Sequence, residues 1–205
     1  MACHTPFATP YPLDEAGQCG LCRRKLTRFD SALSYGFYEG PLRKLIHLFK
    51  YHGVVTLAGP LAGFLTTAEG RERAPDWIVP VPMHWWRELT RGYNQAEMLA
   101  REYSSRAGVP MVRALCRNRF TPPQAGLSDK DRRQNLRGAF RVTESPSNRH
   151  VLLIDDVFTT GATASACASA LKEAGAATVR VLTVARVDRR VSVPGLGRRA
   201  ISTTA

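Results

Sequence analysis

A short segment after position 150 constrains the fold of this chain most strongly. Residues 151–154 form a continuous apolar run, VLLI, and the sequence DDVFTTGAT follows directly. An uninterrupted apolar run is typical of a central parallel strand that is buried on both faces. The glycine and the small hydroxylated residues then turn into a helix predicted from about Thr163 to Ala174 and closed by Gly175. The segment therefore predicts a strand–turn–helix unit of an α/β fold, with two aspartates at the carboxyl end of the strand.

Further strands and helices alternate along the chain. We predict strands at 77–82, 109–116, 150–157 and 177–186, and helices at 94–108, near 42–49 and near 57–65. This alternation favours a parallel sheet covered by helices on both faces. We expect residues 31–187 to form this α/β domain. Residues 1–30 would form a separate Cys-containing segment, and residues 188–205 a basic flexible tail.

The composition favours a single-domain protein of the cytoplasm. The chain has 205 residues, of which 44% are hydrophobic, which is enough for a buried core. No apolar run approaches the roughly 18 residues of a membrane span, and the N-terminus lacks the basic and apolar regions of a signal peptide. Five cysteines, an odd number, fit cytosolic thiols or metal ligands better than a disulfide framework. We therefore predict a cytoplasmic location without membrane insertion.

The net charge of +12 is large for a chain of this length. Such a charge points to a polyanionic partner, either a nucleic acid or a phosphorylated small molecule. An Arg-rich and Ala-rich composition also arises from a coding bias toward high GC content, and this explanation stays open. The sequence contains no helix-turn-helix, RRM or KH signature that would favour nucleic acid.

The adjacent carboxylates of Asp155 and Asp156 repel each other, which raises the cost of ionising both. Such a pair is tolerated where both groups face water or a polar ligand, and carboxylates bind hydroxyl groups. A few residues later, the helix start offers N–H groups, the close backbone approach of Gly161 and threonine hydroxyls to an anion. A ribose 5-phosphate combines neighbouring hydroxyls with a phosphate. The alternative, a strand–turn–helix with an Asp N-cap, accounts for one aspartate and one threonine but not for the whole string.

Four stretches carry a resemblance to a known family. LLIDDVFTTGAT (152–163) resembles the phosphoribosyl-pyrophosphate (PRPP) loop of the type I phosphoribosyltransferases. LIHLFKYHG (45–53), VPVPMHWWRELTRGYNQAEMLA (79–100) and QAGLSDKDRRQNLRGAF (124–140) resemble, in the same order, the ComF/GntX branch of that superfamily. The resemblance implies the parallel-sheet type I phosphoribosyltransferase fold, preceded by a small zinc-ribbon-like segment.

The resemblance also implies roles for individual residues. Asp155 and Asp156 would hold the ribose 2- and 3-hydroxyls. The phosphate would lie on Phe158, Thr159, Thr160, Gly161, Ala162 and Thr163, the pyrophosphate near Met83, His84, Arg87 and Arg91, and a mobile loop would bring Arg132, Arg133 or Arg137 to the leaving group. A solvated surface position is the open alternative for each arginine. Mg²⁺ would bridge pyrophosphate and ribose oxygens, held largely by substrate and water.

The cysteines near the N-terminus depart from the family pattern. Family members open with two CxxC pairs, which together form a four-Cys zinc site. Here Cys19 and Cys22 form one pair, but the partner of Cys3 would fall one residue before Met1. We expect an upstream in-frame cysteine to complete the Zn²⁺ site. His4 or water as the fourth ligand, or a CxxC without metal, are the alternatives.

Two classes of function remain open at this stage. In the first, the chain transfers a phosphoribosyl group from PRPP to an unknown base. In the second, it is a non-catalytic PRPP-sensing or single-stranded-DNA-binding module, because the ComF branch is associated with competence and DNA uptake. The acidic pair and Gly161 favour binding of PRPP or ribose 5-phosphate. The net charge keeps single-stranded DNA and the DNA-uptake machinery as partners.

Overall fold

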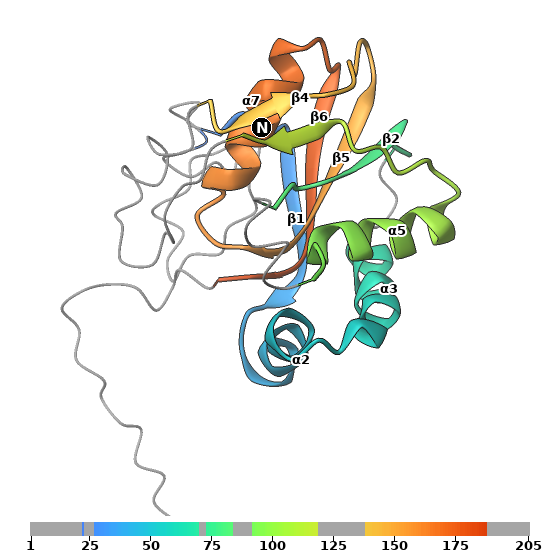
Figure 1. Ribbon diagram of the computed structural model, residues 1–205, viewed down its shortest axis with the longest axis vertical. Helices are drawn as coiled ribbons and strands as arrows, with labels where there is room; N and C mark the ends of the chain where they lie inside the picture. The colour runs from blue at the N-terminus through green and yellow to red at the C-terminus, as the bar shows by residue number, and fades with distance from the viewer. Residues whose placement is uncertain (1–21, 23–26, 70–72, 84–91, 119–137, 188–205) are drawn as a thin grey trace, which may run out of the picture.

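A four-stranded parallel sheet forms the centre of the computed structural model (Figure 1). The structure describes residue 22 and residues 27–69, 73–83, 92–118 and 138–187. The strands of this sheet lie in the order β1 (Ser31–Phe37), β6 (Thr178–Arg186), β5 (His150–Phe158) and β2 (Trp77–Pro80). β5 pairs with β2 through Val151 to Ile154 and with β6 along almost its whole length. The apolar run of the sequence is therefore an inner strand, as predicted.

Helices cover both faces of this sheet. α7 (Ala162–Glu173) packs on one face, which we call the α7 face. α2 (Gly40–Tyr51), α3 (Ala58–Glu69) and α5 (Gln95–Ala107) cover the other, the three-helix face, and η1 (Val55–Leu57) joins α2 to α3. Figure 1 shows α7 in orange on the opposite side of the sheet from the teal α3 and the green α5. The predicted helices and the two-sided α/β architecture are confirmed.

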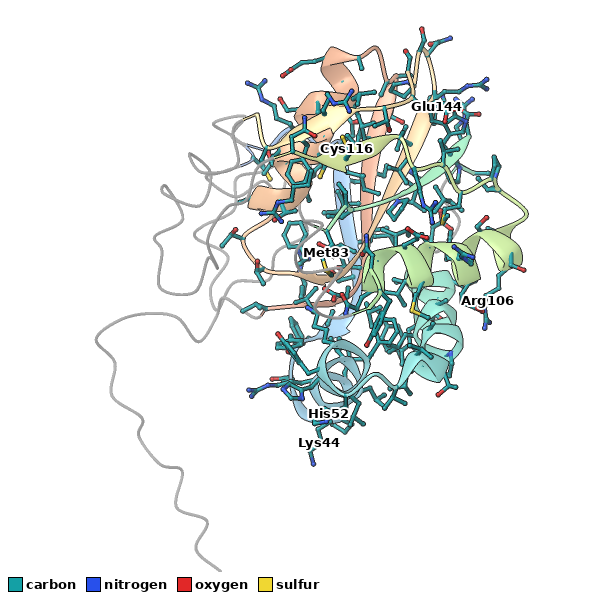
Figure 2. All side chains as sticks on the ribbon, viewed as in Figure 1. Lys44, His52, Met83, Arg106, Cys116 and Glu144 are labelled. Carbon is teal, nitrogen blue, oxygen red and sulfur yellow. The ribbon has the colours of Figure 1, made fainter. Side chains whose placement is uncertain are left out.

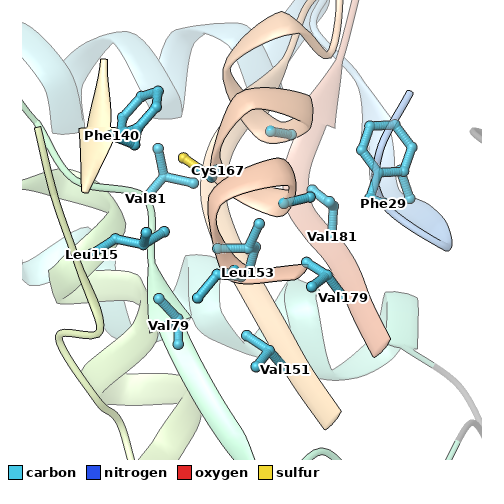
Figure 3. Packing of buried hydrophobic residues seen from close by; sticks show 14 of the residues in the cluster. Phe29, Val79, Val81, Leu115, Phe140, Val151, Leu153, Cys167, Val179 and Val181 are labelled. Atoms are coloured by element: carbon cyan, nitrogen blue, oxygen red, sulfur yellow. The ribbon is translucent and has the colours of Figure 1, made fainter. Parts of the chain in front are cut away.

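The sheet separates two hydrophobic cores. On the α7 face, Val151 and Leu153 of β5 pack with Cys167 of α7 and with Phe29, as Figure 3 shows. On the three-helix face, Leu152 and Ile154 pack with the buried residues of α2, α3 and α5. Successive side chains of a strand point to opposite faces, so the run VLLI serves both cores at once. This explains why the strand has no polar residue between Val151 and Ile154.

Capping residues fix the ends of α5. The Asn94 side chain accepts a hydrogen bond from the Ala96 N–H at 3.0 Å and so caps the start of the helix. At the other end, Gly108 adopts a left-handed conformation with φ of 66° and closes the helix. The start of α5 is thereby held beside the end of β2, where the Asn94 side chain also donates to the Val81 carbonyl at 3.3 Å.

The strand predicted at 109–116 is wrong in this form. Pro110 has no N–H to donate, so the segment meets β2 only in a single bridge between Met111 and Ile78. The chain then forms β3 (Leu115–Arg117), which pairs antiparallel with β4 (Phe140–Val142) in a second, two-stranded sheet. The sequence pattern also did not predict β1 and β4. β1 is an edge strand with mixed polar and apolar residues, and its sequence lacks a clear alternation.

Among the described residues, none of the helices is both long and apolar enough to cross a membrane. The boundary of the predicted tail at 188 and most of the Cys-containing segment lie outside the described residues.

Candidate functional site

A cleft opens at the carboxyl ends of β5 and β2, where open parallel sheets bind their ligands. Its volume is about 260 Å³, close to the lower end of ordinary ligand pockets. The residues that line it come from five parts of the chain: Lys50, Val81, Pro82, Met83, Asn94, Gln95, Ala96, Arg117, Asp155, Asp156, Val157, Thr159 and Thr163. Met83, labelled in Figure 2, lies beside the start of α5. The predicted acidic pair and two residues of the predicted phosphate loop therefore share one cavity.

The two carboxylates of the pair have different surroundings. Asp155 is half-buried and lies on the α7 face, the side of Val151 and Leu153. Its Oδ1 accepts a hydrogen bond from the backbone N–H of Asp156 at 2.9 Å. Asp156 is only 7% exposed. The sequence pattern predicted that both carboxylates face water or ligand, but the Asp156 carboxylate already has a partner inside the protein.

That partner is Lys50, near the end of α2. Its Nζ lies 2.8 Å from Oδ2 of Asp156. The side chains of Lys50 and Asp156 are 19% and 10% exposed, so the ion pair is largely shielded from water. Such a pair stabilises a fold only when the geometry is good, and removing one partner strands the other charge. The ion pair therefore fixes the position of the Asp156 carboxylate at the cleft.

Electrostatics distinguish the two aspartates further. Burial, together with the negative charge of Asp156, raises the pKa of Asp155 to about 7. Lys50 opposes this rise but does not cancel it. Burial acts to lower the pKa of Lys50, yet the ion pair with Asp156 outweighs burial and the pKa of Lys50 lies above its ordinary value. Near neutral pH the cleft thus holds one lysine cation, one ion-paired carboxylate and one carboxyl group that titrates.

The loop after β5 brings threonine side chains and the start of α7 to the cleft. Thr159 and Thr163 line the cleft. The hydroxyl of Thr160 accepts a hydrogen bond from the Ala162 N–H at 3.2 Å and so orders the start of α7. The first N–H groups of a helix have no acceptor within that helix, so the start of α7 offers donors to an anion. These positions agree with the predicted phosphate loop, whose role as a ligand site stays a prediction.

Gly161 and Phe158 have structural reasons for their identity. Gly161 adopts φ of 74°, and a Cβ atom built there would lie 2.6 Å from Cζ of Phe158. The Phe158 side chain is 6% exposed and packs in the core against Phe29, with ring centroids 5.9 Å apart. The side chain of Phe158 therefore supports the loop from below, and its predicted contact with phosphate stays a prediction.

Arg117 brings a second cation to the cleft. It comes from β3, and its guanidinium carbon lies 5.6 Å from the centre of the Phe140 ring.

Nearby on α7, burial raises the pKa of the Cys167 thiol well above its ordinary value, and the charge of Asp155 adds to this rise. Cys167 is therefore a protonated core thiol, as its apolar sequence surroundings indicate.

Several predicted site residues lie outside the described residues: Cys3, Cys19, His84, Arg87, Arg91, Arg132, Arg133 and Arg137. Of the predicted pyrophosphate residues, Met83 is described and lines the cleft. Of the predicted zinc ligands, Cys22 is described. It is 2% exposed and packs in the core on the α7 face, where the Thr27 hydroxyl lies 3.9 Å from its Sγ.

Lys50, Gln95 and Arg117 were not predicted from the sequence as residues of the cleft. Lys50 and Gln95 both occur in stretches that carry the family resemblance, FKYHG and RGYNQ, but spacing alone could not bring them to the acidic pair. The signal that would have found Lys50 is a lysine placed, by helical spacing, beside the inward apolar positions Ile46 and Phe49.

Sequence comparison with known proteins identifies the family of this chain. Competence protein F of Haemophilus influenzae is 34% identical over 181 residues, which cover 83% of this chain and 79% of that protein. The chain belongs to the ComF family. DNA utilization protein YhgH of Escherichia coli K12 is 33% identical over 175 residues, 82% of this chain and 77% of that protein. The model of the phosphoribosyl transferase domain matches residues 93–194, which include the acidic pair and the loop.

A ComF protein is thus built on a phosphoribosyltransferase domain of type I fold, as the sequence predicted. Among solved structures, the allosteric regulatory enzyme of purine biosynthesis is similar at 23% identity with a TM-score of 0.44. The match covers 63% of this chain and 26% of that one.

Proposed function

We propose that this ComF protein binds PRPP or ribose 5-phosphate in the cleft at the carboxyl end of β5. The observation that carries the proposal is the shared cavity of Asp155, Asp156, Thr159 and Thr163. One oxygen of each carboxylate has a partner within the protein, the Asp156 N–H or Lys50. The other oxygen of each would accept a hydrogen bond from a ribose hydroxyl. Thr159, Thr163 and the N–H groups at the start of α7 would hold the 5-phosphate.

The donor set of the cleft fits Mg²⁺ that arrives with the substrate. Among the described residues, no three His, Cys, Asp or Glu side chains cluster as a metal site. Two carboxylates at the cleft, one of them paired with Lys50, suit an ion that takes most of its oxygens from substrate and water. When bound, Mg²⁺ would neutralise negative charge on the pyrophosphate.

The reaction we propose is displacement of pyrophosphate from C1 of the ribose by a nitrogen nucleophile. The bond from C1 to the pyrophosphate oxygen breaks, the bond from C1 to nitrogen forms, and the nitrogen loses its proton. Positive charge develops on the sugar ring in the transition state. The residues of this chain would contribute by fixing the ribose through its hydroxyls and the 5-phosphate, so that C1 is held between nucleophile and leaving group.

Calorimetry tests the binding step. The full chain is titrated with PRPP and Mg²⁺, and then with ribose 5-phosphate and with 2-deoxyribose 5-phosphate as matched ligands. We expect ribose 5-phosphate to bind at least about tenfold more tightly than the 2-deoxy compound, because a hydrogen bond to a charged group contributes roughly 1.5–3 kcal/mol. Lack of binding by both PRPP and ribose 5-phosphate would refute the proposed function.

The transfer step needs its own assay. The protein, PRPP and Mg²⁺ are incubated with a panel of purine and pyrimidine bases, and release of pyrophosphate is measured. Release that depends on one base, and that disappears in Asp155→Asn, would support phosphoribosyl transfer. Tight binding of PRPP without release for any base would favour a sensing role over transfer.

Two relatives are named competence protein F and DNA utilization protein, and these names suggest the biological setting. We propose that this chain acts in DNA uptake or use as well. Titration with single-stranded DNA across a salt series tests a direct contact, since phosphate contacts make affinity fall steeply with salt. If the protein does not bind DNA even at low salt, a direct role on DNA is excluded, and its role would have to run through other proteins of DNA uptake or use.

The zinc site at Cys3, Cys19 and Cys22 stays a prediction. Its support is the CxxC spacing of the last two cysteines and the position of Cys22 inside the folded domain. The test is the zinc content of the purified protein, alone and extended by the codons upstream of Met1. Zinc absent from both preparations would rule out these cysteines as ligands.

A further inference from the structure

The end of α2 is anchored by the segment that begins α5. The last carbonyl groups of a helix have no donor within that helix. Here the Tyr93 hydroxyl donates to the Phe49 carbonyl, and the Gln95 amide donates to the Lys50 carbonyl at 3.5 Å. The Gln95 residue is 1% exposed, and its contact with the Lys50 carbonyl is partly buried. Two residues of the YNQ sequence therefore fix the backbone of Phe49 and Lys50.

This anchoring determines where the Lys50 side chain goes. The neighbouring Phe49 is buried in the core of the three-helix face, and its ring lies 6.1 Å from that of Tyr93. The Lys50 side chain leaves the same turn and reaches Oδ2 of Asp156 at 2.8 Å. By contrast, Lys44 on the same helix and His52 just after it are exposed, and Figure 2 shows them at the end of the molecule away from the sheet.

We propose that Lys50 is a positioning residue that makes Asp156 a binder of ribose hydroxyls. This inference rests on the proposed function and deepens it. By engaging Oδ2, Lys50 fixes the position of the carboxylate and leaves its other oxygen for a ligand in the cleft. Without Lys50, the two carboxylates of the acidic pair would place two like charges in one cavity, which disfavours ionising both of them. Lys50 supplies a positive charge to one member of that pair before any ligand binds.

Two other roles of Lys50 would leave a different signature. If Lys50 bound an anionic part of the ligand directly, its loss would weaken every phosphorylated ligand by the same factor. If Lys50 served only to stabilise the fold, its loss would lower the melting temperature without changing the order of ligand affinities. Only a role through Asp156 changes the preference for ligands that carry both hydroxyls.

The experiment therefore measures a ratio of affinities. Calorimetry on the full chain compares ribose 5-phosphate with its 2-deoxy and 3-deoxy analogues. The larger of the two preferences reports the hydroxyl that Asp156 holds most strongly. In the parent protein we expect this preference to be about tenfold or more. In Lys50→Met we expect it to fall to about threefold or less. Lys44→Met removes an exposed lysine from the same helix and should leave the ratio unchanged.

Two further variants guard against a folding defect. Lys50→Arg keeps the cation and should retain most of the preference. In the background of Asp156→Asn, Lys50→Met should produce no further change in the ratio, because the residue through which Lys50 acts is already altered. Each variant is first checked by circular dichroism and thermal unfolding.

The outcomes separate this inference from the function on which it rests. If the parent protein binds neither ribose 5-phosphate nor PRPP, both are overturned. If the parent protein prefers ribose 5-phosphate and Lys50→Met keeps that preference, the role of Lys50 is overturned and the proposed function stands. A lost preference in Lys50→Met that Lys50→Arg retains supports the positioning role.

Discussion

The two faces of β5 form the two halves of the cleft in different ways. On the α7 face, Asp155 is followed by a loop made from the next few residues, and the donors of that loop are backbone groups and threonine hydroxyls. On the three-helix face, Asp156 meets Lys50 of α2, whose turn is anchored by Tyr93 and Gln95. One half is local in sequence, and the other is assembled from three distant segments.

This difference explains how two adjacent aspartates coexist. On the α7 face, burial and the neighbouring charge raise the pKa of Asp155 to about 7, so the carboxyl takes up a proton near neutral pH. On the three-helix face, the ion pair with Lys50 compensates the charge of Asp156. The repulsion is therefore relieved by a proton at one residue and by a lysine at the other.

The largest expected effect comes from replacing both carboxylates of the acidic pair. Asp155→Asn with Asp156→Asn should weaken ribose 5-phosphate binding by at least about 100-fold, since two charge-assisted hydrogen bonds of roughly 1.5–3 kcal/mol each are lost. Calorimetry measures the loss, with Glu144→Gln, an exposed carboxylate outside the cleft lining, as a control. A double variant that binds as tightly as the parent would show that the aspartates do not hold the hydroxyls.

The next effect tests the local half of the cleft. Gly161→Val places a β-branched side chain at a positive φ and directly against the Phe158 ring, so we expect a loss of about 3 kcal/mol in the free energy of unfolding. Thr160→Ala removes the hydroxyl that accepts from the Ala162 N–H and should cost about 1 kcal/mol. Chemical denaturation compares the two. Equal losses would mean that the loop does not depend on the backbone conformation of Gly161.

The same contrast explains what the sequence could predict. The strand, the loop and the start of α7 are contiguous, so their apolar run, acidic pair and glycine predicted both the elements and the ligand class. The contact between Gly161 and Phe158 could not be predicted from the sequence, because it depends on how the end of the strand turns. Lys50 and Gln95 could not be placed from the sequence, since their partners are set by the packing of α2 and α5 on the sheet. The false strand at 109–116 arose because its apolar pattern outweighed Pro110 in the prediction.

Single substitutions should separate the two aspartates by the sign of their effect on stability. Asp156→Asn leaves Lys50 without its carboxylate, so we expect a loss of about 2 kcal/mol at pH 7. Asp155→Asn removes a carboxyl whose pKa of about 7 in the folded state lies above the ordinary 3.8. With a raised pKa, the contribution of the Asp155 carboxyl to the stability of the parent is fully present below about pH 4 and is lost as the pH rises through about 7.

Relative to the parent, Asp155→Asn should therefore gain stability between about pH 5 and pH 8, by about 1–2 kcal/mol at pH 8. Thermal unfolding at both pH values, for both variants, provides the measurement. If both substitutions destabilise the protein to the same extent at pH 8, the two aspartates do not differ in the way proposed here.

The smallest expected effect concerns the half of the cleft on the three-helix face, at the contact between Tyr93 and α2. Tyr93→Phe removes only the hydroxyl that donates to the Phe49 carbonyl, while the ring stays against Phe49. The loss of one hydrogen bond should cost about 1 kcal/mol, or a fall in melting temperature of about 2–4 °C. Because the turn that carries Lys50 becomes less well fixed, ribose 5-phosphate should also bind less tightly, by about twofold to fivefold. Tyr35→Phe, which removes a hydroxyl from an exposed tyrosine on β1, is the matched control and should change neither quantity. An unchanged affinity in Tyr93→Phe would mean that Lys50 reaches Asp156 without help from the start of α5, and the two halves of the cleft would then depend less on distant segments than the contacts suggest.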